Sequence, residues 1–158
     1  MTIKTIFVLI FLAQPLLLTT PCYSESVNSL SNYISTPEEL AVWLSRNLTY
    51  EFVFGGKRAQ TLQEFLDSKK GNCEDFANLA SEILKRMGIK NKVIILKLKG
   101  SPADHAACIW KNNDGTYSFI SNEELYKTKE TIVADAIAKF FPECYKISDY
   151  SDARIAWR

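Results

Sequence analysis

Two side chains, Cys73 and His105, have the types that nucleophilic chemistry needs, and His105 is the only histidine in the chain. The thiolate of a cysteine is a strong nucleophile, and an imidazole titrates near neutral pH and can accept the proton of a thiol. Together they could carry out acyl transfer, in which sulfur attacks a carbonyl carbon and a base moves the protons. Taken separately, a cysteine is more often a small core residue and a lone histidine is more often structural.

A helix is predicted to begin near Cys73 and to end at Gly88. Its apolar residues recur at steps of three and four and would form one buried face: Phe76, Ala77, Ala80, Ile83, Leu84 and Met87. The first N–H groups of a helix lack partners and carry positive potential, so they favour a thiolate and could bind an oxyanion. Glu74 and Asp75 oppose this effect, because their negative charges disfavour ionisation of the thiol.

The setting of His105 is the start of a predicted strand over His105–Lys111, which a turn over 112–115 joins to a second strand over Thr116–Ile120. A catalytic imidazole needs a partner that fixes its orientation. A two-residue turn centred on Asp114-Gly115 or on Asn113-Asp114 would place the side chain of Asn122 beside His105, on the same face of the hairpin. A three-residue loop would instead place Asn122 on the opposite face. The alternative is that Asn122 is an ordinary loop or helix-capping residue.

The remaining cysteines give no sign of a metal site, because Cys108 and Cys144 lack close metal-ligand spacing and only one histidine is present. A disulfide between Cys108 and Cys144 would leave the Cys73 thiol free, and three unpaired cysteines are an equally good interpretation. The absence of a C-x-x-C motif disfavours a redox role for Cys73.

The predicted elements run from helices to strands. Thr36–Glu39 and Thr61–Glu64 are capping boxes that begin two helices ahead of the one at Cys73. The other predicted elements are strands over Tyr50–Phe54, Lys92–Leu98 and within Tyr145–Trp157, and a helix over Thr131–Phe141. This order predicts an α+β fold, with N-terminal helices packed on a small, mostly antiparallel sheet.

Residues 1–24 have the pattern of a secretory signal: Lys4, an apolar run and small residues suited to cleavage after Ser24. We therefore expect an exported protein, periplasmic or secreted, with one domain over 25–158 and no integral membrane segment after cleavage. An uncleaved anchor is the alternative. The full chain has 19 basic and 18 acidic residues, and cleavage would remove only Lys4, which leaves 18 of each and a net charge of zero. A neutral domain has no electrostatic reason to bind nucleic acid.

The run Gly71–Ala77, the helix end Met87–Ile89 and the pair His105–Ala106 resemble the transglutaminase-like superfamily, most closely the bacterial transglutaminase-like cysteine peptidases. The resemblance implies a papain/transglutaminase-like fold with Cys73 as nucleophile, His105 as base and position 122 as the orienting residue. The family usually carries Asp there, whereas this chain has Asn122, which a Cys-His-Asn triad can use.

The same resemblance bears on cofactors. Acidic residues beside the cysteine bind calcium in some members, so it implies at most a weak calcium site at Glu74 and Asp75, with no cofactor required for the chemistry. A second departure from the family pattern is Asn72, where the peptidases tend to carry Asp.

These observations predict a monomeric cysteine hydrolase, a peptidase that acts on an amide bond of a protein or peptide through an acyl-enzyme. Transfer to an amine instead of water remains open. The alternative is a catalytically weak or inactive domain that binds another protein of the cell envelope, an interpretation that Asn122 favours.

Overall fold

The structure is a computed structural model that describes residues 25–52 and 59–150, so the predicted signal at 1–24 lies outside the described residues. The described helices are α1 (Val27–Leu30), α2 (Pro37–Asn47), α3 (Leu62–Ser68), α4 (Cys73–Arg86) and α5 (Val133–Ala138). The described strands are β1 (Thr49–Tyr50), β2 (Lys70–Gly71), β3 (Asn91–Leu98), β4 (His105–Lys111), β5 (Tyr117–Ser121), β6 (Glu124–Lys127) and β7 (Cys144–Asp149).

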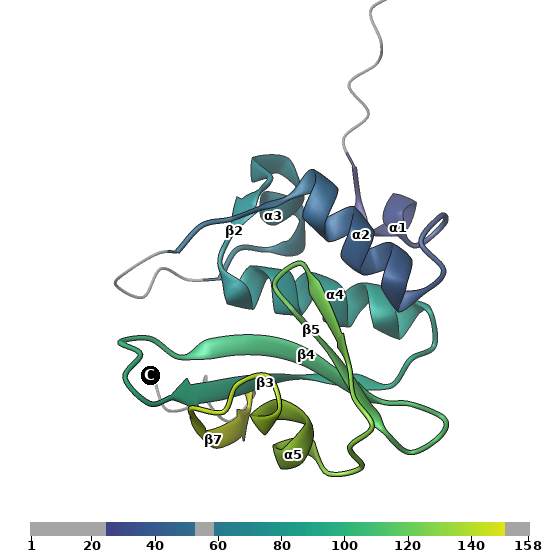
Figure 1. Cartoon of the computed structure of the whole chain (residues 1–158). Helices are drawn as coiled ribbons and strands as arrows, with labels where there is room; N and C mark the ends of the chain where they lie inside the picture. Colours follow the sequence, from purple (N-terminus) through teal and green to yellow (C-terminus); the bar gives the residue numbers. More distant parts are fainter. Residues whose placement is uncertain (1–24, 53–58, 151–158) are drawn as a thin grey trace, which may run out of the picture.

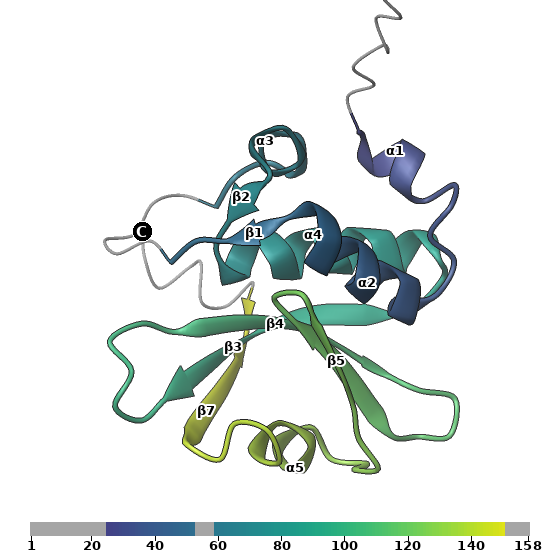
Figure 2. The same cartoon turned by 45° about the horizontal axis from the view of Figure 1, so that its top comes forward.

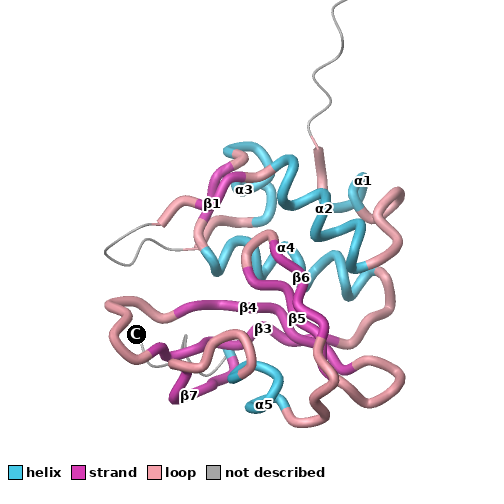
Figure 3. The backbone as a smooth tube through the Cα atoms, viewed as in Figure 1, coloured by secondary structure: helices cyan, strands magenta, loops and turns pink. Residues whose placement is uncertain are grey.

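A five-stranded antiparallel sheet in the order β6-β5-β4-β3-β7 forms the centre of the fold, which confirms the predicted α+β class. Helices α1 to α4 lie on one side of this sheet and α5 lies on the other (Figures 1 and 2). Strands β1 and β2 form a separate parallel pair next to the first turn of α4 (Figures 2 and 3). The sheet therefore presents one face to α4 and the other to α5.

The predicted capping boxes begin two of the helices. Thr36 and Glu39 exchange side-chain and backbone hydrogen bonds at the start of α2, and Thr61 and Glu64 do the same for α3. Each box satisfies N–H groups that have no partner within the helix, so the starting residue of the helix is fixed by sequence. At the far end of α4, Gly88 has φ of +78°, the left-handed conformation that ends helices.

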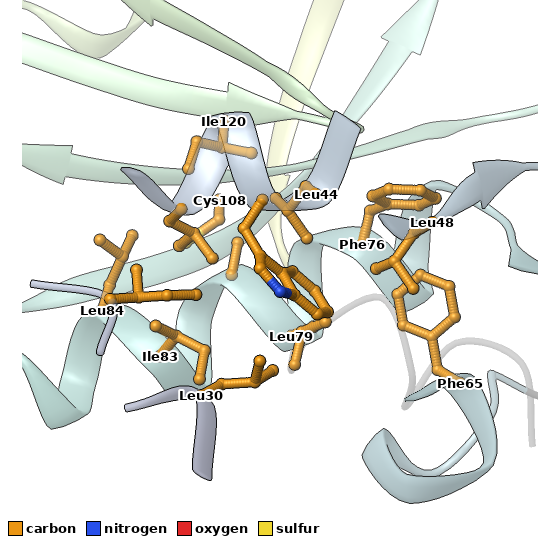
Figure 4. Packing of buried hydrophobic residues seen from close by; sticks show 14 of the residues in the cluster. Leu30, Leu44, Leu48, Phe65, Phe76, Leu79, Ile83, Leu84, Cys108 and Ile120 are labelled. Carbon is orange, nitrogen blue, oxygen red and sulfur yellow. The ribbon is translucent and has the colours of Figure 1, made fainter. Parts of the chain in front are cut away.

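The core lies on both faces of the sheet. On the α4 face, side chains from α2, α4 and the sheet interlock, as Leu44, Phe76 and Ile120 do in Figure 4. On the opposite face, Ile137 of α5 packs with buried residues of the sheet, among them Phe119. Burial on both faces holds α4 in a fixed position against the middle strands, which matters because α4 begins with Cys73.

Three predicted elements differ in extent from those observed. The predicted strand over Tyr50–Phe54 is a two-residue pairing, β1, and the second half of that segment lies outside the described residues. The last helix, predicted over Thr131–Phe141, is the six-residue α5, and the strand predicted within Tyr145–Trp157 is β7, which begins one residue earlier at Cys144. Strand β6 was not predicted, because Glu124–Lys127 is only four residues long and has no alternation of polar and apolar residues.

The β4–β5 hairpin has a three-residue loop. The Asn112 N–H donates to the Thr116 carbonyl oxygen at 2.7 Å, which leaves residues 113–115 in the loop, and Gly115 has φ of +88°. The register pairs Cys108 with Ile120. This loop length is the case that reverses the parity on which the prediction for Asn122 depended.

All three described cysteines are free thiols. Cys108 is buried on the α4 face of the sheet, whereas Cys144 packs with the cluster on the α5 face. Of the two interpretations left open, the structure agrees with three unpaired cysteines and not with a Cys108–Cys144 disulfide, because the sheet separates those two side chains. Within the described ranges, no helix combines the length and apolar character needed to cross a membrane.

Candidate active site

The first residue of α4 is Cys73, and the N-cap before it is Asn72. The Asn72 Oδ1 accepts the backbone N–H of Glu74 at 2.9 Å and that of Asp75 at 3.2 Å. The next N–H, of Phe76, donates to the Asn72 carbonyl oxygen. Asn72 thus binds three of the first four N–H groups of the helix, and the fourth, that of Cys73, contacts the sulfur of its own side chain.

Asp75 holds this end of the helix in place. Its side chain is buried, and its Oδ2 accepts the backbone N–H of Asn72 at 2.9 Å. Its Oδ1 accepts the backbone N–H of Gln60 at 2.7 Å, and the Gln60 side chain reaches Oδ2 at 3.2 Å. The carboxylate thus ties the segment before α3 to the first turn of α4 with charge-assisted hydrogen bonds.

The predicted weak calcium site at Glu74 and Asp75 stays a prediction. Both oxygens of Asp75 accept N–H groups, and Glu74 accepts the hydroxyl of Tyr150 at 3.3 Å. Within residues 25–52 and 59–150, no group of three or more His, Cys, Asp or Glu side chains could hold a metal ion. The donor set around Asp75 thus fits a structural carboxylate better than a calcium ligand, because a cation would displace N–H donors.

Gly71 is needed for packing rather than for substrate access. A Cβ at this position would lie 2.6 Å from Cε2 of Phe65 and 2.7 Å from Oδ2 of Asp75. Only glycine allows α3, β2 and the first turn of α4 to come this close.

The Cys73 sulfur is part-buried beside Ala77, Ile95 and Ala106. Burial raises the pKa of the Cys73 thiol, the backbone N–H of Ala106 lowers it, and the charge of Glu74 raises it. Burial dominates, so the resting form is the neutral thiol, contrary to the thiolate expected from the helix N-terminus alone.

His105 is the first residue of β4, paired with Leu96 of β3. Its Nε2 lies 2.7 Å from the Ser121 Oγ, and its ring stands 5.5 Å from that of Phe141, centroid to centroid. Burial lowers the pKa of His105, so the imidazole is neutral at pH 7. A neutral, oriented imidazole can act as a general base.

The residue that contacts the His105 imidazole is Ser121, not Asn122 as the sequence predicted. The register of the three-residue loop places Ser121 on the same face as His105, diagonally across the β4–β5 pair. Asn122 follows in the turn between β5 and β6, with φ of +51°. The sequence contained one signal for this outcome, the loop-length dependence of the register.

Cys73 and His105 both lie at the start of β4: His105 is its first residue, and the Cys73 sulfur contacts the next residue, Ala106. The sulfur lies against the N–H of Ala106, the residue after His105, while the imidazole is turned towards Ser121 and Phe141. Between these two described side chains there is no hydrogen bond. The described contacts thus place the thiol and the imidazole at the start of the same strand without joining them, and a catalytic Cys73–His105 pair stays a prediction.

Comparison with known proteins identifies the family. A family model described as a transglutaminase-like domain matches residues 22–137, which is most of the chain. The chain belongs to this transglutaminase-like family. The mouse centrosomal protein of 76 kDa is 43% identical over 68 residues, which cover 41% of this chain and 10% of that protein. The chain thus spans about a tenth of that relative's length.

Solved structures share the fold. LapG of Legionella pneumophila superposes with a TM-score of 0.56 at 14% identity, covering 83% of this chain and 79% of LapG. An EGTA-treated form of LapG gives a TM-score of 0.55 at 13% identity, covering 80% of this chain and 77% of that one. At this identity the likeness establishes the transglutaminase-like fold alone.

Proposed function

We propose that the protein is an exported cysteine hydrolase that cleaves an amide bond of a protein or peptide. The observation that carries the proposal is the Cys73 thiol at the first residue of α4, against the backbone that follows His105, with the imidazole held by Ser121. Membership of the transglutaminase-like family supports a thiol nucleophile. The pattern of residues 1–24 supports export.

The first half-reaction forms an acyl-enzyme. The His105 imidazole accepts the thiol proton as the Cys73 sulfur attacks the amide carbonyl carbon, forming a C–S bond and an oxyanion. We expect the N–H of Cys73, which the Asn72 side chain does not bind, to donate to that oxyanion. The C–N bond then breaks, and His105 gives its proton to the departing amine, which leaves a thioester.

The second half-reaction restores the thiol. Neutral His105 removes a proton from water as the oxygen adds to the thioester carbonyl; the C–S bond then breaks to release a carboxylic acid, and the His105 imidazolium returns the proton to the departing Cys73 sulfur. The Nε2–Ser121 contact would keep the ring in place through both steps. Catalytic hydrogen bonds are often long before substrate binds, so a Cys73–His105 contact that forms with substrate fits this mechanism.

A proteome-derived peptide library tests the proposal, because it offers many amide bonds at once and requires no defined substrate. The wild-type protein should generate new peptide termini, and Cys73→Ala should generate none, because the variant lacks the nucleophile. A fluorescent primary amine in the same reaction reports transamidation, since its Cys73-dependent attachment to peptides would replace hydrolysis as the activity. Identical peptide patterns from both proteins would contradict an enzymatic role.

Three observations favour a second candidate, a catalytically weak domain that binds another protein of the cell envelope. The pKa of Cys73 is raised, the His105 imidazole makes its hydrogen bond to Ser121, and Ser121 supplies no negative charge to stabilise an imidazolium. Protein binding that survives Cys73→Ala, with no cleavage by either form, would support this candidate.

A further inference from the structure

The turn between β5 and β6 contains two buried oxygens that have no hydrogen-bond partner within the described part of the chain, Oδ1 of Asn122 and Oε2 of Glu123. Both can accept hydrogen bonds, and the second belongs to a carboxylate. A buried acceptor without a donor is unfavourable, and a carboxylate oxygen is more so. Two such atoms on adjacent residues therefore form a site that a ligand with N–H donors would complete.

This turn lies near the nucleophile. The β5–β6 hairpin reaches towards α4 and α2, as Figures 1 and 3 show, and both helices contact it. Tyr50 connects the two sites: it pairs with Gly71, two residues before Cys73, and its ring centroid is 6.4 Å from that of Phe76. Burial raises the pKa of Tyr50, and the charges of Cys73 and Glu123 raise it further, so its hydroxyl lies within electrostatic range of both groups.

Glu123 forms no ion pair among the described residues. Its charge acts on the hydroxyls of Tyr50 and Tyr126, neither of which can supply a positive charge. Among the described residues, the ion pairs formed by lysine and arginine all involve other carboxylates. A carboxylate and a second acceptor thus lie at the tip of the β5–β6 hairpin, Tyr50 lies within electrostatic range of that carboxylate, and Ala106 of the neighbouring strand β4 contacts Cys73.

We propose that Glu123 and Asn122, with the ring of Tyr50, form a subsite that binds a cationic group of the substrate, an ammonium or a guanidinium, next to the scissile amide. Such a group donates several N–H bonds, neutralises the carboxylate and is attracted to an aromatic face. The proposal rests on the proposed hydrolase, for which it names a substrate class, a peptide with a basic group beside the cleaved bond.

Charged thiol reagents test this subsite without requiring catalysis. In a Cys22→Ser, Cys144→Ser background, which removes the cysteine outside the described residues and the other part-exposed described thiol, Cys73 is treated with the trimethylammonium-ethyl or the sulfonatoethyl methanethiosulfonate. In each case the thiolate displaces methanesulfinate and forms a mixed disulfide. Each rate is divided by the rate of the same reagent with the denatured protein, which removes the intrinsic reactivity of the reagent.

The normalised rate should favour the cationic reagent, and Glu123→Gln should reduce this preference about tenfold by removing one nearby charge. Glu124→Gln is the matched control, because it removes the same charge from the same hairpin, where Glu124 accepts the Tyr126 hydroxyl. Neutral methyl methanethiosulfonate should react equally with all three proteins, which shows that the thiol remains accessible.

An equal preference in the wild type and Glu123→Gln would overturn the subsite, as would an equal loss in Glu124→Gln. The result is separable from the proposed hydrolysis. A Glu123-dependent preference for the cation without any Cys73-dependent cleavage would support the subsite while it removes the hydrolase. Cleavage without the preference would do the reverse.

Discussion

The Oγ of Ser121 is the atom that orients the His105 ring, at 2.7 Å from Nε2. A hydroxyl can fix an imidazole in place, but it cannot stabilise the imidazolium as a carboxylate does. Burial also lowers the pKa of His105, so the ring stays neutral to a lower pH than an ordinary imidazole and can accept a proton at neutral pH. A base of this kind suits a thiol that is itself neutral at rest.

Ser121→Ala should therefore reduce Cys73-dependent cleavage by about tenfold to a hundredfold, the usual effect of losing an orienting hydrogen bond. Ser118→Ala is the matched control, since Ser118 is a buried serine of the same strand whose Oγ accepts from Asn112 at 2.9 Å. The measurement is kcat/KM on any peptide found in the library, with thermal unfolding of each variant alongside.

A carboxylate in place of Ser121 shows whether this side chain acts on the His105 imidazole or only fills space beside it. Ser121→Asp should raise the pKa of His105, because a neighbouring negative charge favours the imidazolium. The acidic limb of the pH–rate profile would then move to higher pH, since the neutral base becomes available later. Unchanged activity in Ser121→Ala, or an unmoved acidic limb in Ser121→Asp, would show that Ser121 does not position the base.

Sequence reasoning at this scale succeeded where residue type decides the outcome and failed where geometry decides it. It placed Cys73 at a helix start and His105 at a strand start, and the structure has both. It could not find Ser121, because one residue of loop length exchanges the faces of the hairpin. The position of Cys73 at a helix start led us to expect a thiolate. The thiol is neutral instead, because it is buried by packing that the sequence does not specify.

Among the elements, the first turn of α4 is the one that the site depends on most. Asp75 connects it to Gln60, and Gly71 lets Phe65 pack against it. These contacts fix the direction in which the N–H of Cys73 points. A change that moves this turn by a fraction of an ångström would move the nucleophile and the oxyanion donor together.

Gly71→Ala tests this dependence. The new methyl group would overlap Cε2 of Phe65 and the side chain of Asp75, so we expect a loss of about 2–3 kcal/mol in the free energy of unfolding. Gly100→Ala is the control, because Gly100 has φ of +82° and open space around its Cβ, so only the left-handed backbone costs it about 1 kcal/mol. Chemical denaturation measures both, and equal losses would contradict close packing at Gly71.

The helices with strong caps were predictable, whereas the short elements were not. The capping boxes at Thr36 and Thr61 fix the starts of α2 and α3 through local hydrogen bonds, which sequence encodes directly. Strand β6 exists because it pairs with β5, a contact between segments that no local pattern announces. The same holds for the shortness of α5, which begins at Val133 without a side-chain cap.

Over the whole molecule, the two halves of the chain make different contributions. The helical half supplies Cys73, and the sheet supplies His105 and Ser121 from two adjacent strands. The order of elements was enough to predict this α+β division. It was not enough to place the cysteines, because Cys108 and Cys144 lie on opposite faces of one sheet, which only the strand register determines.

The most direct test of the account is the rate of iodoacetamide alkylation at Cys73 between pH 5 and 10, in the wild type and in His105→Ala, both with Cys22→Ser and Cys144→Ser. The wild type should show a shoulder of reactivity that begins below pH 6.5, as neutral His105 becomes available to accept the thiol proton. In His105→Ala only the rise that follows thiol ionisation should remain, above the ordinary thiol pKa of about 8.5.

The comparison between the two profiles decides the matter. Loss of the shoulder in His105→Ala would establish that the imidazole activates the Cys73 thiol across the end of β4. Superimposable profiles, with both proteins unreactive until the thiol ionises, would contradict the pairing of Cys73 with His105 and with it the proposed hydrolase.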